Sequence, residues 1–299
     1  MGMKGLTAKL TALPGNVRGV LWAVSAALFF SIMLTLIKLL GQTAPVAQIL
    51  FIRQSVMFAV ALPLIAREFP SSLLTQKMNL HLVRVMFATG SMVAGFLAII
   101  HLPLADATAL GFSRTFFITL FAIAILRESV DGRRWLAILI GFVGVIVMLR
   151  PGQAELDVYA LLAIVGAASA AAVSILIRIL SRTERPVTIL TYQAVLVGLI
   201  AAPVAAVVWV PLSPLEWLMA IGVGLAASAG QMSNIRSFRA GEASVVAPID
   251  YTKLIWTTLL GYILFAALPG MHTLLGAVII VTASLYVLLR EMRSKARRV

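Results

Sequence analysis

Long apolar runs separated by short polar gaps extend from about residue 17 to residue 290. A helix needs about 20 apolar residues to cross a bilayer, and ten runs reach or approach that length. Turn-forming Pro and Gly residues separate many of them, and no gap is long enough for a soluble domain. The pattern therefore predicts an all-α membrane protein with ten transmembrane helices. They are expected at residues 17–40, 46–66, 80–100, 104–126, 134–150, 158–180, 187–210, 214–236, 243–267 and 271–290.

The composition agrees with this pattern. Apolar residues make up 61% of the chain and charged residues only 12%, whereas soluble domains carry about 25% charged residues. The chain has no cysteine, which excludes disulfides and thiolate metal sites. Its net charge of +13 comes from residues in the gaps between apolar runs. This distribution indicates membrane topology and not a nucleic-acid-binding face.

Lys and Arg mark the cytoplasmic loops of a membrane protein. They concentrate around residues 67–77, 127–134, 182–185 and 236–239, and near both ends of the chain. The remaining gaps contain one clear cation, Arg150. These gaps instead collect the acidic residues Asp106, Glu155, Asp157 and Glu216. We therefore predict a bacterial inner-membrane protein with both termini in the cytoplasm.

The chain also repeats itself. Sliding it along itself by about 139 residues, close to half the length of its predicted helical region, places Arg114 on Lys253. The shift gives two halves of five predicted helices each, at residues 17–150 and 157–290. Because five is odd, the two halves must cross the membrane in opposite directions. Inverted repeats are a recurring plan of secondary transporters, in which the substrate binds near the midplane between the halves. The predicted architecture is two inverted five-helix repeats.

One stretch is similar to a known family. Residues 126–135 read LRESVDGRRW and are followed by GFVGV at 141–145. This stretch, together with the helix layout of nearly the whole chain, resembles the EamA family of the drug/metabolite transporter superfamily. Residues 265–269, FAALP, have alanine where the family often has glutamate in the second copy. The resemblance implies a secondary transporter that exports amino acids, aromatic ones included, and related metabolites without a cofactor.

Charged residues inside the bilayer are costly, at about 2.5–3.5 kcal/mol each, and usually face a cavity or a partner. Arg114 and Lys253 each lie about ten residues into a predicted helix, or roughly 15 Å from its end. The inverted repeat would bring both cations together near the midplane, where they need an anion. A substrate carboxylate is one solution, and Asp250, three residues before Lys253 on the same helix face, is another. Asp250 could form a permanent ion pair or couple transport to protons.

The other intramembrane cations have simpler interpretations. Lys38 lies near the outer end of the first helix and could extend its ammonium to the headgroups. Arg178 matches it in the second half and could do likewise. Arg53 could lie at the rim of a pocket or guide the substrate, so Arg53 and Lys38 are candidates for gating or rim residues.

Polar and aromatic side chains could complete a pocket for a zwitterion with a ring, or could form hydrogen bonds between helices. Gln54 and Gln193, which the repeat makes equivalent, fit either role. The candidates are Ser113, Tyr192, Gln193, Gln231, Asn234, Tyr251 and Trp256.

Three further functions deserve comparison with amino-acid export. A passive facilitator of the same fold, or an exchanger of sugar phosphates or nucleotide sugars, would use a similar site. An intramembrane enzyme is disfavoured because His81, His101 and His272 are isolated and no His-Glu-x-x-His motif occurs. The expected partners are a small-molecule substrate, the lipid bilayer and protons, but not nucleic acid, and the expected state is a monomer or weak dimer.

Overall fold

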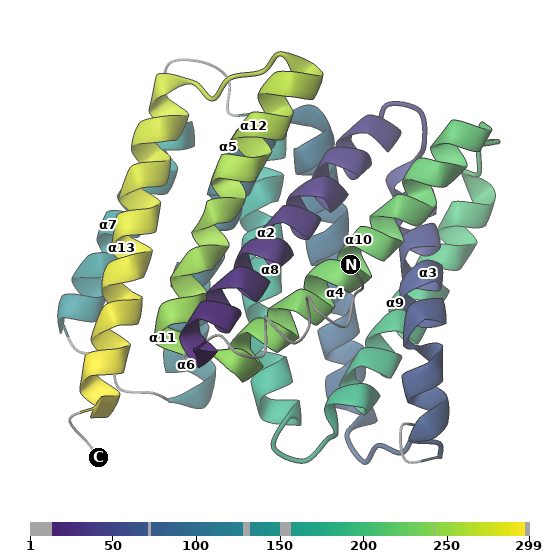
Figure 1. The fold of residues 1–299 in the computed structure, drawn as a ribbon, viewed down its shortest axis with the longest axis horizontal. Helices are drawn as coiled ribbons and strands as arrows, with labels where there is room; N and C mark the ends of the chain where they lie inside the picture. Colours follow the sequence, from purple (N-terminus) through teal and green to yellow (C-terminus); the bar gives the residue numbers. More distant parts are fainter. Residues whose placement is uncertain (1–13, 71–72, 128–131, 150–156, 242, 297–299) are drawn as a thin grey trace.

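The computed structural model describes residues 14–70, 73–127, 132–149, 157–241 and 243–296, and within these residues the regular elements are all helical (Figure 1). In chain order they are α2 (Gly15–Leu40), α3 (Val46–Arg67), α4 (Met78–His101), α5 (Leu104–Gly111), α6 (Arg114–Leu126), α7 (Gly132–Leu149), α8 (Val158–Leu180), α9 (Pro186–Val207), α10 (Pro214–Ala240), α11 (Ala243–Val246), the 3₁₀ helix η1 (Ala247–Thr252), α12 (Lys253–Phe265) and α13 (Met271–Ala296).

The described helices agree with the ten predicted spans. Seven helical stretches are long and apolar enough to cross a membrane, with α5 and α6 counted as one stretch from Leu104 to Leu126. Two shorter apolar helices cover Ile138–Leu149 and Met271–Ala283, within α7 and α13. The remaining predicted span is divided among α11, η1 and α12. The all-helical fold is therefore confirmed.

Two of the ten spans are broken, which the apolar pattern did not predict. Phe112 and Ser113 interrupt the span at 104–126, and η1 interrupts the span at 243–267. At the first break the backbone tightens to i→i+3 bonds, with Phe112 N–H donating to Ala109 O at 3.1 Å. A 3₁₀ segment within a helix often marks a hinge. Pro248, which has no backbone N–H, favours the second break.

The breaks provide structural support for the inverted repeat. Arg114 begins α6 and Lys253 begins α12, at positions that the repeat makes equivalent. The helices also end alike, because Arg127 (φ 53°) and Ala266 (φ 50°) both adopt the left-handed conformation and are related by the same shift. Non-glycine residues rarely adopt this conformation. Its recurrence at matching positions shows that the two halves share a backbone plan.

The helix packing follows the same symmetry. Helix α2 packs along α10, and its counterpart α8 packs along α4. Helices α7 and α13 pair with each other at one side of the molecule, and α3 pairs with α9 at the other (Figure 1). The interface between the halves therefore runs through the whole molecule and leaves the centre to α2, α4, α8 and α10.

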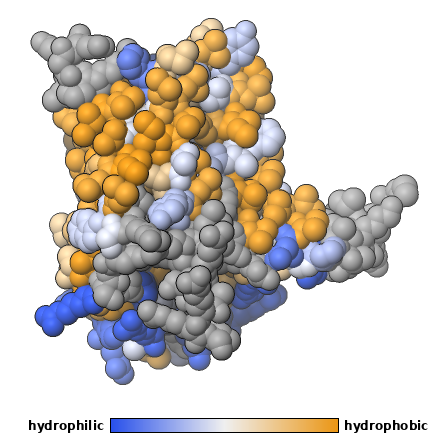
Figure 2. Space-filling view, turned by 90° about the vertical axis from the view of Figure 1, so that its left-hand side faces the viewer, coloured by the Kyte–Doolittle hydropathy of each residue, from blue (hydrophilic) through white to orange (hydrophobic). Residues whose placement is uncertain are grey.

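The outer surface suits a lipid environment. Viewed from the side of α7 and α13, hydrophobic residues form a broad band, and hydrophilic residues gather toward the lower end (Figure 2). Exposed apolar side chains on these two helices include Leu139, Val143, Leu275 and Val278. Such a large apolar surface is rare on a soluble monomer and is typical of a membrane-facing one.

Lys38 differs from its sequence interpretation. Its ammonium does not extend to the headgroups, because the residue is only 8% exposed. Nζ donates to the carbonyls of Ile99 and Ile100 at 3.1 Å and to that of Leu102 at 2.5 Å. The last carbonyls of a helix have no partner within the helix and favour a cation, so Lys38 caps the end of α4. Arg178, the basic residue in the last turn of the corresponding helix α8, is exposed.

Asp106 also differs from its sequence interpretation as a loop residue. It lies in the first turn of α5, close enough to Lys38 for an electrostatic interaction. Asp106 is thus, like Asp250, an acidic residue within a membrane-spanning element. The carboxylate of Asp106 and the three carbonyls together compensate the buried charge of Lys38.

The capping role of Lys38 predicts a stability effect. Lys38→Met should lower the unfolding free energy by about 2 kcal/mol or more, because three carbonyls lose their donor in a water-poor site. Arg178→Met, the matched change in the second half, should have little effect, since Arg178 is exposed. Thermal unfolding of the two purified variants in detergent measures the difference. Equal stability of the two variants would contradict the capping role.

Candidate functional site

A cavity of about 410 Å³ lies beside both helix breaks. Its walls come from α2, α4, α5, α6, α8, η1 and α12, and thus from both halves of the chain. The charged residues that line it are Arg114, Asp250 and Lys253, and most other lining residues are small or apolar. Pockets of roughly 300–1,000 Å³ with a few placed polar groups are typical of small-molecule sites.

Arg114 has no carboxylate partner within ion-pair distance among the described residues. It is the first residue of α6 and is exposed, although it lies in the middle of a membrane span, because it borders the cavity. Its Nη2 donates to Ser174 Oγ on α8 at 2.6 Å, and Ser174 Oγ donates in turn to Ala170 O at 2.8 Å. The guanidinium charge is therefore held by a neutral hydroxyl and keeps further donors for an anion.

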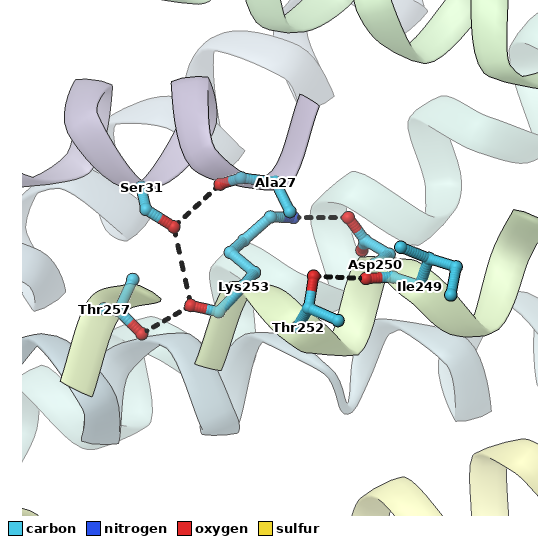
Figure 3. A network of polar contacts seen from close by, with 7 residues as sticks. All are labelled: Ala27, Ser31, Ile249, Asp250, Thr252, Lys253 and Thr257. Carbon is cyan, nitrogen blue, oxygen red and sulfur yellow. Dashed lines mark hydrogen bonds and ion pairs between the residues drawn. The ribbon is translucent and has the colours of Figure 1, made fainter. Parts of the chain in front are cut away.

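Lys253 and Asp250 form the ion pair that their spacing predicted. Lys253 Nζ lies 2.8 Å from Asp250 Oδ1 (Figure 3) and 5.3 Å from the centre of the Phe30 ring on α2. The Lys253 side chain is 18% exposed and that of Asp250 is 58% exposed. The carboxylate of Asp250 is therefore neutralised by Lys253 but remains accessible, and it also influences Arg114 electrostatically.

The ion pair is anchored to α2. Ser31 Oγ on α2 donates to Ala27 O at 2.8 Å and lies 3.4 Å from Lys253 O, and Thr257 Oγ1 donates to the same carbonyl at 3.0 Å (Figure 3). These contacts hold the first residue of α12 at the break. The position of Lys253 is thus set by its backbone, and its ammonium is held by Asp250 beside the Phe30 ring.

Three other predicted residues flank the cavity without lining it. Tyr251 packs edge-on against Phe112, which does line the cavity, with ring centres 4.9 Å apart. Ser113 is fully buried at the first break. Trp256 lies one turn beyond Lys253, and its indole Nε1 is buried without a hydrogen-bond partner in the described part of the chain.

The predicted pair Tyr192 and Gln193 lies elsewhere, between α3, α4 and α9. Tyr192 Oη donates to Leu73 O at 2.8 Å. Gln193 Oε1 accepts from Arg84 Nη1 at 3.2 Å, and Gln193 O accepts from Gln54 Nε2 at 3.4 Å. These contacts match the alternative in which the glutamines join helices to each other.

Arg53 and two residues of α10 also lie outside the cavity lining. Arg53 is 8% exposed, and its Nη1 donates to Gln54 Oε1 at 2.7 Å and contacts Met92 Sδ at 3.6 Å. It is therefore buried in this structure and not at a rim. Gln231 is partly buried on α10, and the backbone carbonyl of Asn234 accepts from Ser237 Oγ at 2.7 Å.

Sequence reasoning gave no site role to two polar residues, His81 and Arg84, which are both 0% exposed. Arg84 Nη2 donates to Ile189 O at 2.9 Å, and the His81 ring packs against Tyr192 at a tilt of 30°, with ring centres 4.6 Å apart. Arg84 stands near the start of the predicted span at 80–100, where an arginine is common at a helix end. Its spacing of three from His81, which places both on one helix face, was the available signal.

Comparison with known proteins identifies the family. The sequence profile of the EamA-like transporter family matches residues 17–150 and 158–289, which together make up most of the chain. The chain belongs to the EamA family. The resemblance carried by residues 126–145 is confirmed, and the chain is a multi-pass membrane transporter of the drug/metabolite superfamily.

The named relatives in this family carry different cargoes. The pseudopaline exporter of Pseudomonas aeruginosa is 30% identical over 270 residues, which cover 89% of this chain and 94% of the exporter. The S-adenosylmethionine uptake transporter of Rickettsia prowazekii is 26% identical over 287 residues, covering 96% and 98%. The riboflavin transporter of Brucella anthropi is 29% identical over 257 residues, covering 83% and 89%. Family membership thus shows metabolite transport but does not single out amino acids.

A solved structure shares the fold. A crystal structure that is 18% identical in sequence superposes with a TM-score of 0.62, covering 92% of this chain and 99% of that chain. At this identity the likeness concerns the fold alone.

The exposure of Asp250 predicts a moderate role in stability. Removing one partner of a fully buried pair costs about 3–5 kcal/mol, and an exposed pair contributes about 0–1 kcal/mol. Asp250→Asn should therefore fold and lose about 1–2 kcal/mol of unfolding free energy, because Lys253 is left without its anion. Lys253→Met added to Asp250→Asn should recover most of that loss. Unfolding of the single and double variants in detergent measures both changes, and an unrecovered loss would show that the pair is not its source.

Proposed function

We propose that this EamA transporter is a secondary carrier that exports amino acids, aromatic ones included, and related small metabolites across the inner membrane. The observation that carries the proposal is the charge pattern of one cavity. Arg114 contributes a cation without a carboxylate partner among the described residues, and Asp250 contributes an accessible carboxylate. A zwitterion carries one charge of each sign and complements both residues.

The proposed binding mode uses all three charged residues. The substrate carboxylate binds Arg114, whose planar guanidinium can hold it through two parallel hydrogen bonds. The substrate ammonium binds Asp250 in competition with Lys253. Lys253 is then released to serve as the second cation for the carboxylate. Because a zwitterion has no net charge, it gives each charged residue a partner without changing the net charge of the cavity.

The same charge pattern bears on the alternative cargoes. A sugar phosphate or nucleotide sugar carries phosphate charge and has no need of an anionic partner in its site. Asp250, 58% exposed beside Arg114, would repel a phosphate. This repulsion favours a zwitterion over a phosphorylated sugar. A passive facilitator would use the same cavity and would differ only in that transport is not coupled to an ion gradient.

Alternating access is supported by the repeat. In transporters with inverted repeats, the two halves rock about a site near the midplane. Here the helix breaks at 112–113 and 247–252 lie beside the cavity. Their 3₁₀ segments are suited to act as hinges. Exchange of the two halves' conformations would open the cavity first to one side of the membrane and then to the other.

We also propose that both termini lie in the cytoplasm. The turns on one side of the described molecule, at 41–45, 102–103, 208–213 and 266–270, contain no Lys or Arg. Exposed arginines at the opposite helix ends support a cytoplasmic assignment for that side. They are Arg67, Arg127, Arg182, Arg185, Arg236 and Arg239. Arg150 and Glu155 lie outside the described residues.

Labelling of single cysteines tests this orientation, since the natural chain has none. Cysteines at Thr43 and Ser213 should react with an impermeant maleimide added to intact cells. Cysteines at Thr183 and Ser294 should react only after the membrane is permeabilised. The reversed pattern would overturn the orientation, and a mixed pattern would overturn the helix count.

Neutralising the cavity cations tests the binding mode. Arg114→Gln should weaken substrate binding by about one to two powers of ten, because a charge-assisted hydrogen bond contributes roughly 1.5–3 kcal/mol. Lys253→Gln should act in the same direction. Arg114→Lys should also weaken binding, since a point charge cannot replace the fork of the guanidinium. Uptake of labelled amino acids by proteoliposomes, with and without a pH gradient, measures these effects.

Amides of the same amino acids provide the control. The natural chain should prefer the carboxylate to the amide, and Arg114→Gln and Lys253→Gln should lose that preference while remaining monodisperse. Arg182→Gln, which changes an exposed arginine outside the cavity, should keep it. Transport of a carboxylate substrate at the natural rate by both neutral variants would refute the proposed site.

A further inference from the structure

Two glycines border the open volume of the cavity. Gly95 on α4 and Gly111 on α5 both line it, and a Cβ atom built on either would meet no atom within 4 Å. Both are nevertheless partly enclosed by the protein. They differ from the packing glycine Gly166 on α8, whose Cβ would lie 3.2 Å from Gly95 N. Close helix packing thus explains Gly166 but gives no reason for the missing side chains at Gly95 and Gly111.

The inverted repeat shows which residues occupy the equivalent of these two positions in the second half. The shift that places Arg114 on Lys253 also places Gly111 on Asp250 and Gly95 on Asn234. The backbone plan therefore admits a side chain at both positions in the second half. In the first half the side chains are absent, and their place is open. The second half consequently adds the Asp250–Lys253 pair to the cavity, whereas the first half leaves open space at Gly95 and Gly111 near its own cation, Arg114.

The wall around this open volume offers few hydrogen-bond donors. The hydroxyl of Ser91 donates to Gly166 O at 2.8 Å, and that of Thr108 donates to Leu104 O at 2.7 Å. The ring of Phe112, held edge-on by Tyr251, and the side chain of Ile99 also line the cavity. An apolar group fits such a wall better than a sugar or a phosphate, which would lose its hydration without gaining donors.

We infer that the volume against Gly95 and Gly111 is the subsite for an apolar side chain of the substrate, and that the two glycines set the largest side chain this transporter accepts. The inference rests on the proposed function, because the charged end of the substrate must be held by Arg114 and Asp250. The substrate class is then a zwitterion with a bulky apolar or aromatic body. A side chain introduced at either glycine fills the subsite and leaves the charged residues in place.

Binding of labelled L-alanine and L-phenylalanine to purified Gly95→Leu and Gly111→Leu tests this subsite. Phenylalanine affinity should fall about tenfold or more in each variant, because the ring loses its buried volume. Alanine affinity should change by less than about threefold. Leucine is a better helix former than glycine, so neither variant is expected to lose its fold.

Gly90→Leu is the matched control. Gly90 lies on the same helix as Gly95, its Cβ also meets no atom within 4 Å, and it is exposed and does not line the cavity. Its variant should bind both amino acids as the natural chain does. If phenylalanine and alanine affinities fall equally in the two cavity variants, or if neither falls, the subsite is refuted and the charged site stands. If the natural chain binds neither amino acid, the proposed function fails and the subsite fails with it.

Discussion

The hydrocarbon core of a bilayer offers no water to backbone groups, and this constraint decides where the helices of this chain can break. An unpaired N–H or C=O in lipid costs several kcal/mol. The two breaks, at 112–113 and 247–252, accordingly border an internal cavity and retain backbone hydrogen bonds of the 3₁₀ kind. The breaks also put Arg114 and Lys253 at helix starts. The cavity and its charges therefore depend on two interruptions that only the protein interior can tolerate.

The same constraint distinguishes the cations within the membrane spans by their partners. Lys38 is held by three carbonyls at the end of α4, and Arg84 by Gln193 and the carbonyl of Ile189. Lys253 has the carboxylate of Asp250. Arg114 alone among these four has only a neutral hydroxyl as its described hydrogen-bond partner. A charge that is least compensated by the protein is the one best placed to receive an anion from outside.

The repeat is symmetric in backbone but not in chemistry. Equivalent residues start α6 and α12, yet Arg114 contacts Ser174 whereas Lys253 contacts Asp250. The counterpart of Asp250 in the first half is Gly111, which opens space instead of adding charge. The two halves thus share the mechanics that alternating access requires, while their differences make the cavity polar on one side and roomy on the other. A substrate with a charged end and an apolar body matches that division.

The sequence by itself determined the ten spans and their inverted relation, because a bilayer imposes a length and a hydropathy that are visible residue by residue. It also predicted the pairing of Asp250 with Lys253, since a spacing of three fixes a shared helix face. Only the tertiary structure decided that Lys38 caps α4 and that Gln193 bonds to Arg84 instead of lining the cavity. It alone placed the open space at Gly95 and Gly111. Apolar runs look alike whether they face lipid, a neighbouring helix or a cavity, so the partner of each side chain depends on how the helices pack.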